Sequence, residues 1–326
     1  MSKIKLLYRC DDYPNFVHGA VVNYVTDYFE LIAWEPNQTY DPDTVILTTF
    51  QQDFIADAWF RPFEQTGHKV IVDHLFDSDV ELLSRKLHAS KLDLRSPNWM
   101  WYNTAMLAVD HGYHTYCPKP NYTHTFLCLM NKTRDHRDAV LAGLAPELAH
   151  ARWSYVDRGH SIGDANERAT SVFWEFYMNP QWYDSTVWSF VVESWMRSDN
   201  FFANPTYPNY RTEISEKSYK PLAWFHPMIV CGSVDTLKFL RSQGFETFDN
   251  LWSEDYDSIH NDNQRMLTVF DLVRWAAQEY PITCGDWDKI TQQKLLHNNH
   301  RFFDMALVQQ RFYKEIIGDV MEFIET

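Results

Sequence analysis

Residues 214–233 read ISEKSYKPLAWFHPMIVCGS, and the rest of the chain is organised around this stretch. It begins with polar residues that can start a helix, breaks at a His-Pro pair, and ends in an apolar run. The pattern predicts a helix that begins near Ser215 and a buried strand over residues 228–231. A helix followed by a buried strand is the repeating unit of a parallel sheet covered by helices.

The first turn of this helix is a candidate anion site. Ser215 can cap the helix, because its hydroxyl can accept a hydrogen bond from a main-chain N–H group. A helix N-terminus attracts anionic oxygens, and Glu216 and Lys217 stand side by side there. A carboxylate can accept hydrogen bonds from ribose hydroxyls, while an ammonium meets a diphosphate as a point charge. Together these residues predict a site for a nucleotide sugar.

Strands alternate with helical patterns along the whole chain. In the first half, apolar runs predict strands over residues 4–8, 29–34, 44–50 and 69–72. Helical patterns are expected over residues 17–28, 51–60, 79–88 and 98–111. In the second half, strands are expected over residues 126–130, 153–156, 187–192 and 228–231. This alternation favours an α/β fold with parallel sheets.

A proline-containing stretch with little periodicity, residues 112–123, separates the two halves. The length of 326 residues suits two domains. We therefore expect a Rossmann-like domain over residues 1–115 and a second one over residues 116–300. A C-terminal helix within residues 301–326 is expected to pack back across both, with the active site in the cleft between the domains.

Composition narrows the classes of partner. The net charge is −15, and residues 1–117 hold 9 basic against 16 acidic side chains, so neither half is a basic domain. This balance argues against non-specific binding of nucleic acid, although a local basic groove stays open. The five cysteines show no metal-ligand spacing, which predicts reduced thiols in a cytoplasm. No apolar run is long enough for a membrane span.

A second group of cations follows the expected strand 126–130. Arg134, His136 and Arg137 come at its junction with the next helix, and Glu193 directly follows the expected strand 187–192. Because ligands bind at the carboxyl edge of parallel sheets, these side chains are candidates for a diphosphate site. The alternative is that both arginines form ion pairs with nearby carboxylates on a solvated face.

The motifs around these residues resemble the donor-binding half of GT-B glycosyltransferases. S-F-V-V-E-S at residues 189–194, the S-E-K helix and the H-P-M-I-V-C-G run are closest to the α1,3-fucosyltransferase and exostosin-like types. The second half also resembles a group of phage-encoded glycosyltransferases. Their shared segments are H-R at 136–137, W-Y-D at 182–184, S-E-K-S-Y-K-P at 215–221, G-F-E-T-F at 244–248 and S-E-D-Y-D at 253–257.

The resemblance covers about residues 95–280 and implies roles for particular side chains. By its motif, Glu216 would bind ribose, Lys217 would bind phosphate, and Arg137 is the best match to a further phosphate-binding arginine. Arg134, Ser215 and Glu193 are secondary candidates for the donor site. The donor would be a UDP- or GDP-sugar, and no metal is expected, so the acidic segment at 253–257 is not interpreted as a metal-binding D-x-D motif.

The first half carries no matching motif, although this fold usually takes its acceptor and catalytic base from that domain. An inverting transferase needs a carboxylate or histidine within reach of the acceptor hydroxyl. Candidate bases at expected strand ends are Asp11, Asp12, His18, Asp73 and His74. An Asp after a parallel strand is often only a helix cap, and a retaining enzyme would need no such base, so the mechanism stays open.

The sequence therefore predicts a glycosyltransferase in the cytoplasm, which would be the host cytoplasm if a phage encodes it. The acceptor is either a hydroxymethylated base in phage DNA or a glycan, and the oligomeric state is open. One alternative is a non-catalytic glycan-binding or virion-associated protein with a transferase-like fold. Another is a nucleotide-metabolising enzyme that uses the same diphosphate site without transferring a sugar.

Overall fold

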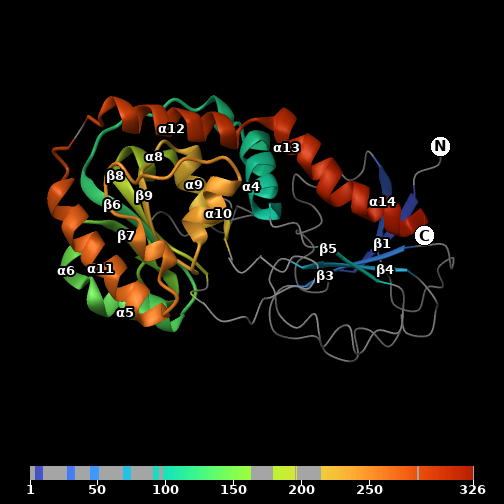
Figure 1. Cartoon of the computed structure of the whole chain (residues 1–326), viewed down its shortest axis with the longest axis horizontal. Coiled ribbons are helices and arrows are strands. Elements are labelled where there is room, and N and C mark those ends of the chain that lie inside the picture. Colours follow the sequence, from blue (N-terminus) through green and yellow to red (C-terminus); the bar gives the residue numbers. More distant parts are fainter. Residues whose placement is uncertain are drawn as a thin grey trace. The chain divides into compact units, whose positions relative to one another are not determined.

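The computed structural model describes residues 4–9, 28–33, 45–50, 69–74, 91–94, 98–162, 179–194, 196, 214–284 and 286–325. The chain divides into two compact units (Figure 1). The first consists of Met1–Asp110 and Met305–Thr326, and the second of His111–Asp304. Each unit contains a parallel sheet, which confirms the expected α/β class. The roles expected for two separate domains stay predictions.

The sheet of the first unit has the strand order β2-β1-β3-β4-β5, and every pairing is parallel. Its strands are β1 Ile4–Arg9, β2 Phe29–Ala33, β3 Val45–Phe50, β4 Val70–His74 and β5 Lys91–Leu94. The first four confirm the expected strands. The sequence did not indicate β5, because its four residues, KLDL, are too few and too polar for a strand pattern. Apart from Tyr28, the helices expected over residues 17–28, 51–60 and 79–88 lie outside the described residues.

The C-terminal segment belongs to the first unit. It forms α13 Met305–Phe312, a π-helical turn Tyr313–Ile317 and α14 Gly318–Glu325, and α4 Trp99–Asp110 packs against α13 (Figure 1). The carboxylate of Glu315 accepts hydrogen bonds from Tyr102 Oη at 2.8 Å and from Asn98 Nδ2 at 2.9 Å. The C-terminal segment is therefore attached to the rest of the first unit through half-buried polar contacts.

The sheet of the second unit has the order β7-β6-β8-β9, again with parallel pairings. Its strands are β6 His124–Met130, β7 Arg152–Tyr155, β8 Thr186–Val192 and β9 Met228–Cys231. Every residue of β8 and β9 is buried, as their largely apolar sequences predict for strands of a parallel sheet that helices cover on both faces. Because the strands run the same way, their carboxyl ends meet at one edge of the sheet.

Helices cover this sheet. α5, α6 and α11 pack together, whereas α9 contacts both β8 and α12 (Figure 1). One helix expected after β6 forms as two, α5 and α6, which divide at Leu144. The helices are α5 Asp135–Gly143, α6 Ala145–Leu148, α8 Pro180–Asp184, α9 Glu216–Ala223, α10 Thr236–Ser242, α11 Asp262–Glu279 and α12 Lys289–Phe302. In the described part of the chain, no helix is long and apolar enough to cross a membrane.

Candidate functional site

The start of α9 has the local structure that its sequence predicts. Ser215 is the N-cap residue, with an extended backbone, and its Oγ accepts a hydrogen bond from Lys217 N at 3.4 Å. The main-chain N–H groups of the first turn, and with them the positive end of the helix dipole, therefore point toward the end of β8. Glu216 and Lys217 are the first two helical residues at this end.

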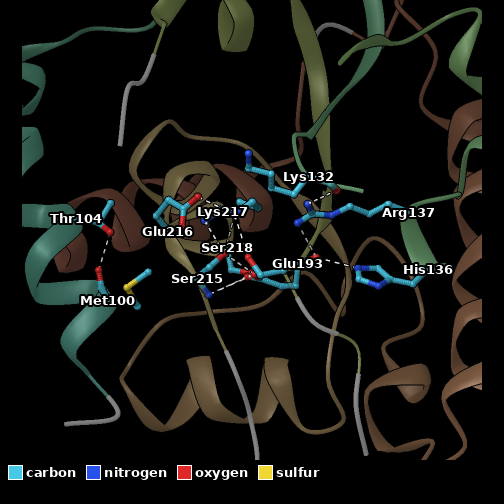
Figure 2. A network of polar contacts seen from close by, with 11 residues as sticks. Met100, Thr104, Lys132, His136, Arg137, Glu193, Ser215, Glu216, Lys217 and Ser218 are labelled. Atoms are coloured by element: carbon cyan, nitrogen blue, oxygen red, sulfur yellow. Dashed lines mark hydrogen bonds and ion pairs between the residues drawn. The ribbon is translucent and has the colours of Figure 1, made fainter. Parts of the chain in front are cut away.

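Glu193, which directly follows β8, fixes this helix start (Figure 2). Its side chain is buried, with 1% of the residue exposed. Oε1 accepts hydrogen bonds from Ser215 N at 3.2 Å and from Ser218 Oγ at 2.5 Å. Oε2 accepts from Ser194 N at 3.2 Å and also from Ser215 Oγ. A buried carboxylate needs such partners, so Glu193 anchors α9 to the sheet through contacts within the protein.

Lys217 and Glu216 form an ion pair next to this anchor. Lys217 Nζ lies 2.7 Å from Glu216 Oε1, and it also donates to Ser194 Oγ and Ser215 Oγ, both at 3.3 Å. The side chain of Lys217 is 19% exposed and that of Glu216 is 8% exposed. Burial alone would raise the pKa of Glu216, but the ammonium groups of Lys217 and Lys220 outweigh it, so the pKa is lowered. Glu216 is therefore ionised at neutral pH.

Arg137, on the first turn of α5, is buried near the ion pair of Glu216 and Lys217. Its Nη2 donates to the main-chain oxygen of Glu193 at 3.0 Å, and its Nη1 donates to that of Lys132 at 2.9 Å (Figure 2). Burial lowers the pKa of the Arg137 guanidinium, while the charge of Glu193 opposes the shift. The guanidinium therefore joins the turn after β6 to the end of β8, instead of pairing with a carboxylate on a solvated face.

His136 adds a second link to the same oxygen. Burial lowers the pKa of His136 to about 4, so the imidazole is neutral at pH 7. Its Nε2 lies 3.0 Å from the main-chain oxygen of Glu193 and acts as the donor to it. The carboxylate of Asp138, an alternative partner for the arginines, instead accepts from Arg158 Nε at 3.0 Å and from Tyr155 Oη at 2.8 Å.

Arg134 is the N-cap residue of α5 and is half-buried at the same edge. Its Nη1 donates to the main-chain oxygen of Thr133 at 3.0 Å, and its main-chain nitrogen donates to Tyr155 Oη at 3.4 Å. All six residues expected at the donor site, Arg134, Arg137, Glu193, Ser215, Glu216 and Lys217, thus lie at strand-to-helix junctions of one sheet edge. Their role in binding stays a prediction.

Three residues of the site were missed by the sequence analysis. Ser194 and Ser218 contact Lys217 and Glu193, and Gly232 follows β9. A Cβ atom on Gly232 would lie 3.2 Å from Cγ of Glu193, so the lack of a side chain lets this chain segment approach the anchor. The sequence did indicate the position of Ser218, because it comes three residues after Ser215 and residues three apart share one face of a helix.

The candidate bases are placed only in part. Asp73 and His74 are the last two residues of β4, where His74 pairs in register with Phe50 of β3 and Asp73 with Leu94 of β5. They therefore lie at the carboxyl edge of the first sheet, as the sequence predicts. Asp11, Asp12 and His18 lie outside the described residues. A catalytic role for any of the five stays a prediction.

The acidic segment at 253–257 has a structural role. The carboxylate of Asp257 accepts hydrogen bonds from the main-chain nitrogens of Leu237 and Lys238, at 2.8 and 2.9 Å, in the first turn of α10. The carboxylate of Glu254 accepts from Thr247 Oγ1 and Phe248 N, both at 2.7 Å. Within the described ranges, no three His, Cys, Asp or Glu side chains gather as a metal site would require.

Comparison with known proteins gives a distant match to a solved structure. No family model and no curated protein sequence matches the chain. Its structure is similar to that of an α1,3-fucosyltransferase. The structure of that protein was solved with GDP-fucose. The two sequences are 8% identical and the TM-score is 0.36, and the match covers 93% of this chain and 90% of the fucosyltransferase chain. At this level, the match carries no information about substrates or individual residues.

Proposed function

We propose that the chain is a glycosyltransferase that moves a sugar from a nucleoside diphosphate donor to an acceptor hydroxyl. The observation that carries this proposal is the start of α9. There, a capped helix N-terminus, a half-buried ammonium and a buried ionised carboxylate meet at the carboxyl edge of a parallel sheet. This combination suits a ligand that has both anionic oxygens and neighbouring hydroxyl groups.

In the proposed complex, Lys217 contacts the diphosphate and Glu216 accepts hydrogen bonds from the ribose hydroxyls. Both assignments follow the resemblance of the S-E-K motif, and the partial exposure of Lys217 supports direct contact. Arg137 is 2% exposed, so it would act through its positive charge and through the position of Glu193. Cations and a helix N-terminus beside the leaving diphosphate would stabilise the charge that develops on it during transfer.

The second unit would then bind a UDP- or GDP-sugar, and the first unit would supply the acceptor site in a GT-B arrangement. The catalytic base would be one of the candidates at the strand ends of the first unit, with Asp73 and His74 at the carboxyl edge of β4. We infer a hydroxymethylated base in phage DNA or a glycan as the acceptor. The net charge of −15 weighs against DNA, and a salt-dependent affinity for duplex DNA would favour it.

The test is thermal unfolding of the full chain with UDP, GDP, CDP, ADP and their sugars. A ligand at about 100 times its Kd stabilises the native state by about 2.7 kcal/mol, which raises the Tm measurably. We expect one nucleotide to raise the Tm of the wild type and Lys217→Met to abolish the effect. Lys238→Met is the matched control, because the side chain of Lys238 on α10 is 71% exposed. Among the described residues, its one ion pair is with Asp235, at 3.6 Å.

The outcomes separate the candidate functions. A shift that is lost in Lys217→Met and kept in Lys238→Met supports the donor site, and release of nucleoside diphosphate with an acceptor would then establish transfer. Nucleotide binding without any transfer would favour a nucleotide-metabolising enzyme. If no nucleotide changes the Tm, the proposal fails, and a non-catalytic glycan-binding protein becomes the better explanation.

A further inference from the structure

The ammonium group of Lys217 is fully engaged by its own protein. An ammonium has three N–H donors. Lys217 Nζ has three acceptors within hydrogen-bond distance: Glu216 Oε1 at 2.7 Å, Ser194 Oγ at 3.3 Å and Ser215 Oγ at 3.3 Å. An anion that binds Lys217 must therefore displace at least one of them. The shortest contact, and the only one of the three with a formal negative charge, is the one to Glu216.

We propose that Glu216 is a selectivity residue, which competes with incoming anions for Lys217 and so excludes inorganic phosphate and pyrophosphate from the site. This inference rests on the proposed function. A nucleoside diphosphate can offer ribose hydroxyls to Glu216 in exchange for the ammonium, so the carboxylate keeps hydrogen-bond partners when the phosphate takes Lys217. A bare anion offers no such exchange. It takes the ammonium and places a second negative charge beside a buried carboxylate.

The surroundings of Glu216 make this exchange necessary. The residue is 6% exposed, so its carboxylate has little access to water that could replace Lys217 as a partner. It is also ionised at neutral pH, since Lys217 and Lys220 lower its pKa despite burial. Its charge therefore cannot be relieved by taking up a proton, and repulsion between Glu216 and a bare phosphate persists across the neutral range.

The charges of Lys217 and Lys220 predict the effect of removing the negative charge of Glu216. Glu216→Gln keeps an oxygen that can accept from Lys217 but removes the negative charge that interacts with the ammonium groups of Lys217 and Lys220. A neutral amide neither repels a phosphate nor binds Lys217 as strongly as a carboxylate does. The variant should therefore bind bare anions more tightly. It should also bind nucleotides more weakly, because an amide is a poorer acceptor for two ribose hydroxyls.

The experiment is isothermal titration calorimetry of the full chain with inorganic pyrophosphate and with the nucleoside diphosphate that gives the largest Tm shift. For Glu216→Gln we expect pyrophosphate affinity to rise on the order of tenfold and nucleotide affinity to fall on the order of tenfold. Ser194→Ala removes a neutral acceptor from Lys217, so it should change pyrophosphate affinity by less than about threefold. Glu246→Gln, at an exposed position, should change neither affinity.

Opposite changes in the two affinities support the inference, because a merely damaged fold would weaken both. Equal pyrophosphate binding by the wild type and Glu216→Gln would overturn it, even if nucleotides bind the wild type normally. A wild type that binds no nucleotide, together with a gain of pyrophosphate binding in Glu216→Gln, would overturn the proposed function while supporting competition at Lys217. The two failures are thus distinguishable.

Discussion

Ser215 donates hydrogen bonds from its main chain and its side chain to Glu193, and these bonds link the candidate site to the sheet. The main-chain nitrogen of Ser215 donates to both oxygens of the Glu193 carboxylate, at 3.2 and 3.3 Å, and its Oγ donates to Oε2. The same Oγ accepts from Lys217 N and from Lys217 Nζ. The carboxylate after β8 therefore fixes the hydroxyl that caps α9 and that contacts the ammonium. A substitution of Glu193 should therefore change the position of Lys217 through Ser215.

The first prediction concerns this anchor. In Glu193→Gln, an amide N–H₂ replaces one acceptor oxygen and faces donors from Ser215 or Ser218. We expect the free energy of unfolding to fall by about 1–3 kcal/mol, with weaker nucleotide binding, because a buried donor then meets another donor. Urea unfolding measures the first effect and calorimetry the second. Ser218→Ala removes only one donor and should cost about 0.5–1.5 kcal/mol. An unchanged urea midpoint in Glu193→Gln would contradict the anchoring role.

The second prediction concerns the close approach of Gly232. In Gly232→Ala, the new Cβ would lie 3.2 Å from Glu193 Cγ and 3.3 Å from Thr236 Oγ1. One of these side chains must move, so we expect a loss of about 1–3 kcal/mol in urea unfolding. Gly318→Ala is the matched control. Its Cβ would meet only the main-chain oxygen of Tyr313, at 3.4 Å, inside a helix, where Ala is favoured over Gly. Equal stability of the two variants would argue against close packing at Gly232.

The third prediction concerns the buried His226. Burial lowers its pKa to about 4, and the neutral ring joins β8 to α8: Nε2 donates to Tyr183 O at 2.8 Å, and Nδ1 accepts from Ser189 Oγ at 3.0 Å. Between pH 6.5 and 4, the unfolded chain binds a proton at this residue and the native chain does not. Its contribution to stability is therefore complete above pH 6.5 and is lost as the pH falls toward 4, by at most about 1.4 kcal/mol per pH unit.

Urea unfolding at pH 7 and pH 5 checks this dependence. The wild type should lose more stability between the two values than His226→Gln, by about 1–2 kcal/mol. His136, whose pKa is also lowered to about 4, adds to the loss in both proteins and so does not obscure the difference. His114→Gln, at an exposed position, should keep the dependence of the wild type. A variant at position 226 that follows the wild-type profile would contradict a neutral, buried imidazole.

The sequence predicted the strands of the second unit well, for a physical reason. A strand of a helix-covered parallel sheet is buried on both faces, so β8 and β9 are largely apolar runs that are easily recognised. The start of α9 was equally clear, because a capping serine before a polar first turn is a local signal. The end of α9 was not. The helix ends at Ala223, and Phe225 then adopts a left-handed conformation with φ 57°, before the expected His-Pro break.

The contacts within the site could not be predicted from the sequence. Nothing local indicates that Glu193 would accept hydrogen bonds from residues 22 and 25 positions further along the chain. The environment of Arg137 was also undecided, since the same residue can lie on a solvated helix face or donate to buried main-chain oxygens. Such choices depend on how β6, β8 and α9 meet in space, which is a tertiary property that residue type and spacing do not encode.

The last prediction separates a structural from a metal-binding role for the acidic segment. The Asp257 carboxylate accepts two main-chain N–H groups at the start of α10, whereas Asp255 is exposed and bonded to Ser253 Oγ at 2.9 Å. Asp257→Ala should lower the free energy of unfolding by about 1–2 kcal/mol, as loss of a helix cap does, while Asp255→Asn should have little effect. EDTA should change neither result.

Metal removal tests the same assignment at the level of binding. If Asp257 is only a cap, nucleotide affinity measured with Mg²⁺ or Mn²⁺ should equal that measured in EDTA, and Asp255→Asn should bind as the wild type does. A D-x-D metal site predicts the reverse, because both carboxylates would hold a cation against the diphosphate. Loss of nucleotide binding in EDTA, restored by added metal in the wild type but not in Asp255→Asn, would therefore replace the cation-and-helix site proposed here with a metal-dependent one.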